Sequence, residues 1–311
     1  MQIPCQAESD LGRCNDYPLM EYLSGAIPDW EVPWVQFLDH DIVCPIGKPL
    51  ELAESGNGKS TLCGLLLLNA IEQGHSVCAY SGELSNSKFL EWIMLQCAGS
   101  PWITLKYDPI KRKQVPVVYP PAAERIKEWY RGKFYLFDSI EDNTENIADS
   151  ILHVFTSVAR RKGCKLFLVD NLMTALLDAG DDENRAQGKF VGALKRFAVR
   201  YGVHVLIVAH PRKTKSGEPI RKDDVGGNKM ITNLASNAVV VERPDLRIIK
   251  ARDGGLNRRV ECCYCGDSRR IYQASIGDKY KYSWDRTGLT PPSIRADSIP
   301  EYGIHMAQQM F

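Results

Sequence analysis

The sequence has no run of about 18 apolar residues, the length that a membrane-crossing helix needs. It also has no signal-peptide pattern at its N-terminus and almost no net charge, because 39 Lys and Arg offset 38 Asp and Glu to leave +1. Any binding to nucleic acid must therefore use a local basic patch. With 44% hydrophobic and 25% charged residues, the composition is typical of a soluble globular protein, which we expect in the cytoplasm and not secreted.

The ten cysteines lack the spacing of a disulfide framework. Most lie inside apolar runs, as Cys63, Cys78 and Cys164 do, which indicates reduced thiols in a reducing compartment. Residues 262–265 contain the only cluster, Cys262, Cys263 and Cys265. The alternation in RRVECCYC is typical of a strand, and no second ligand pair follows at zinc spacing, so we expect no metal there.

The order of periodic segments predicts one α/β domain over residues 46–285, preceded by an arm or linker (residues 1–45) and followed by a loosely ordered tail (residues 286–311). Strand-length apolar runs alternate with amphipathic helical runs, which is typical of a mostly parallel sheet flanked by helices. The last strands follow each other without long helices, which predicts antiparallel edge strands. We expect helices at 60–74, 85–99, 122–132, 145–163 and 185–202, and strands at 75–83, 133–139, 165–171, 203–210, 237–242, 246–252 and 258–265.

Two local features refine this pattern. Ser85 stands where a side chain can cap the N-terminus of the helix at 85–99. Residues 100–121 hold several prolines and a basic run, and we interpret them as a surface insertion.

The stretch AESGNGKST (residues 53–61) resembles a phosphate-binding loop, although Ala53 stands where the opening glycine is usual. An apolar strand precedes the loop and an apolar helix follows it, which is the context that such a loop requires. Its backbone N–H groups and the positive end of the helix would cradle the phosphates of ATP. Lys59 would reach the β- and γ-phosphates, and Ser60 would bind Mg²⁺. The nucleotide-binding residues are therefore Ala53, Ser55, Gly56, Asn57, Gly58, Lys59, Ser60 and Thr61.

Three further strands end in polar residues that suit this chemistry. Asp170 follows the apolar residues of KLFLVDN, where a carboxylate can complete the Mg²⁺ site; alternatively, it only caps a turn. Glu83 ends HSVCAYSGE and would orient or activate water; alternatively, it is a solvated turn residue. His210 ends VHVLIVAH beside a basic run and is a candidate phosphate sensor, although a lone His is more often structural.

Four stretches in order, AESGNGKST, SGELSNSKFLEWIMLQCAG, LFLVDNLMT and VHVLIVAHPRK, resemble the RecA-like motor domain of the DnaB-like replicative helicases. The resemblance is closest to the Twinkle and phage ring-helicase branch and covers residues 45–285. Bacterial members carry alanine at the first loop position, so Ala53 matches the family. The resemblance implies a P-loop NTPase that uses ATP and Mg²⁺, with Lys59, Glu83, Asp170 and His210 as catalytic residues.

The same resemblance implies a ring of identical chains, which we expect to be a hexamer. IIKARDGG is similar to the strand whose Lys-x-Arg pair reaches the ATP of the neighbouring subunit, so Lys250 and Arg252 are expected to act in trans. The family's polar sensor is not clearly matched, and Asn233 is the nearest candidate.

The family's DNA-binding loops correspond to residues 176–187, which are acidic, and 211–229. The second loop could track the phosphates of single-stranded DNA, or it is an ordinary solvated loop. Its cations are Arg212, Lys213, Lys215, Arg221 and Lys222.

The function that the motifs favour is an ATP-dependent DNA helicase in replication. A RecA- or RadA-like recombination ATPase and a non-motor regulatory or loader ATPase stay open as alternatives. Only about 45 residues precede the motor, so we expect any primase or polymerase to be a separate partner. A phage-infected cell or an organelle matrix would suit this branch as well as the cytoplasm.

Overall fold

The computed structural model describes residues 51–52, 58–137, 146–177, 183–210, 230–235, 237–242, 245–250, 259–273, 278, 280–286 and 288–292. The expected arm and most of the expected tail lie outside these ranges, so the two boundaries between the three predicted segments stay predictions. Within the described ranges, no helix is both long enough and apolar enough to span a bilayer.

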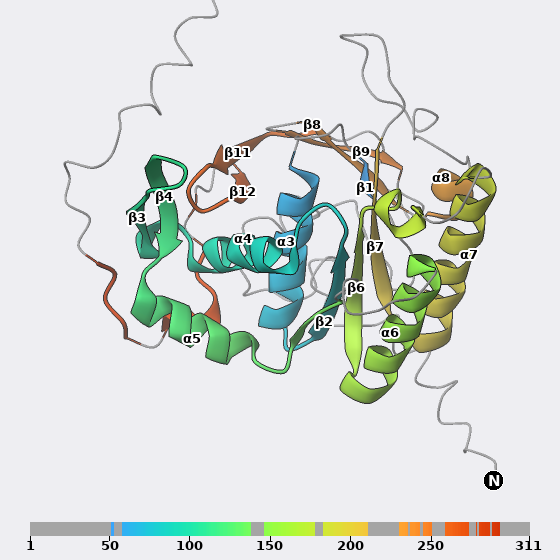
Figure 1. The fold of residues 1–311 in the computed structure, drawn as a ribbon, viewed down its shortest axis with the longest axis horizontal. Helices are drawn as coiled ribbons and strands as arrows, with labels where there is room; N and C mark the ends of the chain where they lie inside the picture. Colours follow the sequence, from blue (N-terminus) through green and yellow to red (C-terminus); the bar gives the residue numbers. More distant parts are fainter. Residues whose placement is uncertain are drawn as a thin grey trace, which may run out of the picture.

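One eight-stranded sheet lies at the centre of the molecule, in the order β10-β9-β8-β1-β7-β6-β2-β5 (Figure 1). The six strands from β8 to β5 run parallel, and β9 and β10 add an antiparallel edge. This arrangement confirms the predicted fold class. The strands are β1 (Glu51–Leu52), β2 (Ser76–Ser81), β5 (Phe134–Leu136), β6 (Cys164–Asp170), β7 (His204–Ala209), β8 (Ala238–Glu242), β9 (Asp245–Lys250) and β10 (Arg259–Val260).

Helices cover both faces of the sheet (Figure 1). Helices α3 and α4 pack on one face with α5 against α4, while α6 and α7 pack on the other with α8 against α7. The Ser85 hydroxyl accepts a hydrogen bond from the Lys88 N–H (3.4 Å), so the predicted cap is confirmed. The helices are α3 (Lys59–Glu72), α4 (Asn86–Ala98), α5 (Pro120–Tyr130), α6 (Ile147–Lys162), α7 (Glu183–Tyr201) and α8 (Met230–Leu234).

Strand β6 shows why the central strands are continuous apolar runs. Leu166 and Leu168 belong to the core under α3 and α4, and Phe167 and Val169 belong to the core under α6 and α7. Because helices cover both faces of the sheet, the residues that point to one face and those that point to the other must both be apolar. After Lys165 near its start, β6 carries no polar side chain until its end, where Asp170 lies.

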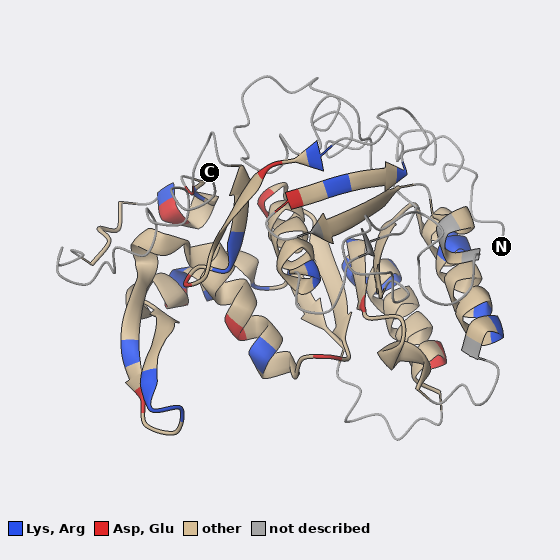
Figure 2. Cartoon of the chain, turned by 90° about the horizontal axis from the view of Figure 1, so that it is seen from above, with Lys and Arg blue, Asp and Glu red and all other residues tan. Residues whose placement is uncertain are grey.

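Most of the expected surface insertion at 100–121 forms a hairpin, which covers residues 103–118. Strands β3 (Ile103–Asp108) and β4 (Lys113–Val118) pair antiparallel, and Figure 2 shows Lys and Arg gathered at the tip. The surface interpretation is correct for the tip, where Ile110 is 92% exposed, but wrong for the base. There Trp102 is buried and packs against Tyr119 and Trp284, with ring centroids 6.5 and 5.6 Å apart.

The expected strand at 258–265 is interrupted, which corrects the prediction of one continuous strand. Val260 ends β10 on the main sheet, and Cys262 begins β11 (Cys262–Cys265), which pairs with β12 (Arg270–Gln273) in a separate two-stranded sheet. The carboxylate of Asp245 explains the break, because it pairs with Arg259 and also accepts the Cys262 N–H (3.3 Å). Cys262 is buried, whereas Cys263 and Cys265 are partly exposed.

Candidate nucleotide site

Four of the predicted site residues meet at one edge of the sheet. Strands β1, β7, β6 and β2 are consecutive neighbours and parallel, so their carboxyl ends lie together. The segment beginning with Lys59 follows β1, Glu83 follows β2, Asp170 ends β6 and His210 follows β7. We call this group of strand ends the nucleotide edge; it is where open α/β sheets bind ligands.

The phosphate-binding loop enters helix α3 through Gly58. This residue has φ of +99°, in the left-handed region that favours glycine, and no side chain caps the helix that follows. The first helical residue is Lys59, whose side chain is 5% exposed. A helix N-terminus with a buried cation beside it suits a phosphate group. Residues 53–57 lie outside the described residues, so the role of Ala53 stays a prediction.

Asp170 is fully buried, and neither carboxylate oxygen has a hydrogen-bond partner of ordinary geometry in the described part of the chain. Burial, with a contribution from Glu83, raises the pKa of Asp170 to about 6, although the nearby Ser60 hydroxyl and Lys59 ammonium act in the opposite direction. A buried carboxylate in this position costs stability unless a cation compensates it. Asp170 and Ser60 together offer the oxygen ligands that Mg²⁺ prefers, so the residues fit this ion.

Glu83, Asn171 and His210 form a hydrogen-bonded triangle. The Asn171 amide donates to Glu83 Oε1, His210 Nε2 lies 2.9 Å from the same oxygen, and Asn171 Nδ2 lies 2.9 Å from His210 Nε2. The Glu83 side chain stays 38% exposed and that of His210 23% exposed. A carboxylate that is both held and open to solvent suits the orientation of a water molecule.

The loop after β6 is built closely around this triangle. Thr174 donates its N–H to Asn171 Oδ1 (3.0 Å), and its hydroxyl bonds the backbone of Asn171. Gly82 donates its N–H to the carbonyl of Asp170 (2.6 Å). A Cβ on Gly82 would overlap the Thr174 side chain and would lie 2.7 Å from the Tyr80 hydroxyl, so only glycine fits beside Glu83.

The β11–β12 sheet packs against the start of α3. Gln96 of α4 donates to the carbonyls of Thr61 (2.8 Å) and Arg269 (3.0 Å), which ties the first turn of α3 to this sheet. Ile271 approaches Gly58, 3.7 Å from the place that a Cβ would occupy. Sequence reasoning missed Gln96 and Ile271, because each acts through a contact between distant segments.

Comparison with known proteins identifies the family. A family model described as AAA domain matches residues 50–216, more than half of the chain. The chain belongs to the AAA domain family. A DNA helicase/primase of Enterobacteria phage T3 is 23% identical to it over 206 residues, 60% of this chain and 33% of the relative. The chain thus spans about a third of the length of that relative.

Two solved structures share the fold of this AAA domain protein. A DnaB-like replicative helicase, described with its interactions with primase, gives a TM-score of 0.58 at 13% identity, over 72% of this chain and 57% of that one. A second structure, described as an ATPase domain, gives 0.58 at 12% identity, over 76% of this chain and 87% of that one. The RecA-like fold and the resemblance to DnaB-like helicases, both predicted from motifs, are confirmed.

The remaining predicted residues of this AAA domain are less defined. The Lys250 ammonium donates to the carbonyls of Ala235 and, at 3.4 Å, Asn233, both at the end of α8 of its own chain. Asn233 is exposed, and no contact in the described residues brings it to the nucleotide edge. The other residues predicted for the ring and for DNA binding lie outside the described residues: Arg252, Arg212, Lys213, Lys215, Arg221 and Lys222.

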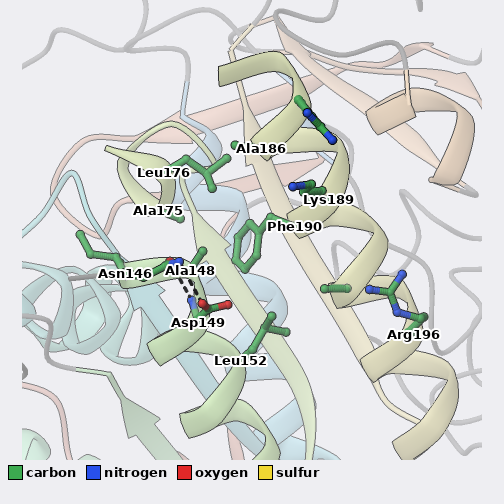
Figure 3. A pocket seen from close by; sticks show the side chains of 13 residues that line it. Asn146, Ala148, Asp149, Leu152, Ala175, Leu176, Ala186, Lys189, Phe190 and Arg196 are labelled. Carbon is green, nitrogen blue, oxygen red and sulfur yellow. Dashed lines mark hydrogen bonds between the residues drawn. The ribbon is translucent and has the colours of Figure 1, made fainter. Parts of the chain in front are cut away.

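A cavity opens between α6 and α7, which we call the groove (Figure 3). It has a volume of about 680 Å³, and its lining combines apolar side chains such as Leu152 and Phe190 with one carboxylate and three cations: Asp149, Arg185, Lys189 and Arg196. Ala175 and Leu176 also line it, directly after Thr174 in the loop that holds Asn171. The groove and the nucleotide edge therefore share one short segment.

Proposed function

We propose that this AAA domain chain is the motor of an ATP-dependent DNA helicase of the DnaB and Twinkle type, acting in replication. One observation carries the proposal: Lys59, Asp170, Glu83 and His210 converge on one edge of a RecA-like sheet. The similarity to a phage helicase/primase and to a DnaB-like replicative helicase supports it.

The residues of this chain divide the work of hydrolysis. Lys59 and the N-terminus of α3 bind the phosphates of ATP, and Ser60 and Asp170 hold Mg²⁺, which would offset phosphate charge when bound. Glu83 orients the attacking water and accepts its proton, because its carboxylate is fixed at one oxygen and exposed to solvent. His210 lies beside Glu83 and precedes residues 211–229, so it can link phosphate binding to that loop.

The proposed assembly is a ring of identical chains, expected to be hexameric. Arg252, and Lys250 once released from the end of α8, would reach the nucleotide of a neighbour. The groove between α6 and α7 suits a segment of another copy, because residues 1–45 hold eight acidic residues and one basic residue together with Trp30 and Trp34. These charges and rings complement the cationic, apolar groove.

The proposed DNA contact is residues 211–229, facing the channel of the ring. Each phosphate contact to single-stranded DNA contributes about 0.7 to the slope of log affinity against log salt. Replacing Arg221 and Lys222 with alanine should lower this slope by about 1.4. Lys127→Ala is the matched control, because Lys127 is an exposed cation on α5 that pairs with Glu124. An unchanged slope would make the loop an ordinary solvated one.

Primase and polymerase are the partners that we propose, and the interior of a cell, an infected cell or an organelle is the proposed location. The primase proposal rests on the two matched proteins whose descriptions mention one. Copurification of this chain with a primase from its own host would test it.

The first experiment measures ATP hydrolysis with and without single-stranded DNA, beside strand displacement on a forked duplex. The motor proposal expects DNA to stimulate hydrolysis and ATP to drive displacement. Stimulated hydrolysis with strand pairing and no displacement would favour a recombination ATPase. Hydrolysis indifferent to DNA would favour a regulatory or loader ATPase.

A further inference from the structure

Asn171 joins the two functional side chains of the nucleotide edge. It contacts Glu83, which is 88 residues away in sequence, and His210, which is 39 residues away. Asn171 is 2% exposed, whereas Glu83 and His210 both reach solvent. The buried Asn171 amide thus contacts two partly exposed side chains, Glu83 and His210.

The orientation of the Asn171 amide is set by its own loop. Its Oδ1 accepts the Thr174 N–H at 3.0 Å, so this end must be the oxygen. The opposite end, the NH₂ group, then faces Glu83 and His210. Asn171 is therefore a donor toward the carboxylate, and rotation of the amide by 180° would cost the bond to Thr174.

One oxygen of Glu83 is the shared acceptor of the triangle. Glu83 Oε1 can accept from both Asn171 Nδ2 and His210 Nε2, and bonds to an ionised carboxylate are the stronger kind. With a hydrogen on Nε2, His210 donates to Oε1 at 2.9 Å; without it, Nε2 accepts from Asn171 Nδ2, which lies 2.9 Å away. In either tautomer of His210, Asn171 donates to Oε1 of Glu83.

We propose that Asn171 is a positioning residue that holds the Glu83 carboxylate in place when His210 turns toward a phosphate. His210 and Asn171 share one acceptor, so departure of His210 leaves Asn171 as the remaining donor to Oε1 in the described residues. A Glu side chain at the surface loses this order without a fixed donor, since its rotamers are then free. The role deepens the proposed ATPase function, and it is a role in geometry rather than in the chemical step.

Asn171→Asp is the direct test. The new carboxylate keeps an oxygen for the Thr174 N–H but replaces the donor to Glu83 with a second negative charge. We expect the kcat for ATP to fall between about 10- and 100-fold while the affinity for a fluorescent nucleotide stays within about twofold. Gln114→Glu is the matched control, because it makes the same change from amide to carboxylate at an exposed position of β4.

Asn171→Ala removes the donor without adding charge, and it serves if the Asp variant does not fold. Thermal unfolding of each variant tests folding. A kcat unchanged in folded Asn171→Asp and Asn171→Ala would overturn the proposal, and so would a loss confined to nucleotide affinity.

A second readout needs no turnover. Nitrogen NMR of the six histidines, with His210 assigned through His210→Gln, reports the tautomer of His210 in the nucleotide-free protein. We expect displaced His210 resonances in Asn171→Asp but not in Gln114→Glu. Unchanged His210 resonances in Asn171→Asp would overturn the link. If the native protein hydrolyses no ATP, the proposed function fails, while this spectrum still tests the contact.

Discussion

The nucleotide edge and the β3–β4 hairpin both carry polar side chains, but the two regions place them in opposite environments. At the edge, Asp170 and Asn171 are 0% and 2% exposed. At the hairpin tip, Tyr107 and Ile110 are 56% and 92% exposed, so even the apolar side chains there face water. A buried carboxylate costs free energy that the core must offset, whereas an exposed Lys or Tyr costs almost nothing. Buried polar side chains therefore indicate function at the nucleotide edge, whereas exposed polar side chains at the hairpin tip do not indicate function by themselves.

The two regions also differ in what holds them together. The edge is held by bonds between distant segments, such as Gly82 N–H to Asp170 carbonyl. The tip is held within itself, because Asp108 accepts the N–H groups of Ile110 and Lys111 at 2.9 and 3.0 Å, which lowers the pKa of Asp108. Only the base of the hairpin, at Trp102, enters the core of the molecule. Substitutions at the nucleotide edge should therefore affect catalysis, and substitutions at the base of the hairpin should affect stability. Substitutions at the hairpin tip should have little effect on either.

Lys59→Ala has the largest expected effect. It removes the buried cation at the N-terminus of α3, and we expect ATP turnover to fall by about 10³-fold or more, since charge on the transferred phosphoryl group is left uncompensated. Steady-state hydrolysis measures it, with Lys127→Ala as the exposed-cation control. Normal turnover in Lys59→Ala would contradict the assignment of the nucleotide edge as the ATP site.

Trp102→Ala tests the base of the hairpin. The side chain is 1% exposed and packs among Tyr119 and Trp284, so its removal leaves a cavity that should lower the free energy of unfolding by about 3–5 kcal/mol. Urea denaturation followed by circular dichroism measures the change. A loss below about 1 kcal/mol would mean that the hairpin is not anchored through this ring.

Asp170→Asn tests the buried carboxylate in the metal-free protein. Its folded pKa of about 6 lies above the ordinary value of 3.8, so the protonated form favours folding below pH 4 and that stability is lost as pH rises through 6. At pH 8 we expect Asp170→Asn to be more stable than the native protein by about 1–3 kcal/mol, with the difference shrinking toward pH 4.

Thermal unfolding across this pH range, with and without Mg²⁺, completes the Asp170 test. Mg²⁺ should raise the melting temperature of the native protein more than that of Asp170→Asn. Equal stability of the two proteins at every pH would contradict the raised pKa of Asp170.

Tyr107→Ser and Ile110→Ser have the smallest expected effect. Both side chains are exposed at the hairpin tip, so each change should alter the free energy of unfolding by less than about 0.5 kcal/mol and leave ATP turnover unchanged. The same urea denaturation and hydrolysis assays measure it. A larger loss of stability or turnover would show that the hairpin tip makes contacts of its own, and would contradict the difference between the tip and the nucleotide edge.

Much of the fold and most of the edge could be predicted from sequence. The apolar runs that end in Asp170 and His210 predicted parallel strands with polar ends, because such runs are required where both faces of a sheet are covered. Ser85 was recognised as a helix cap because the capping bond spans only three residues. These features depend on local conformation and burial, which periodicity along the chain reports directly.

Only the tertiary structure showed the contacts between distant segments. Asn171 was visible as the residue after Asp170, but its bond to Glu83 depends on β2 lying beside β6, and its contact with His210 on β7 lying on the other side. Likewise, Trp102 resembles a surface residue among prolines until Trp284 packs against it. The order of strands in the sheet depends on contacts between residues that are distant in sequence. No local pattern encodes which strands become neighbours. The sequence by itself determined which residues stand at the strand ends, and the tertiary structure decided which of them touch.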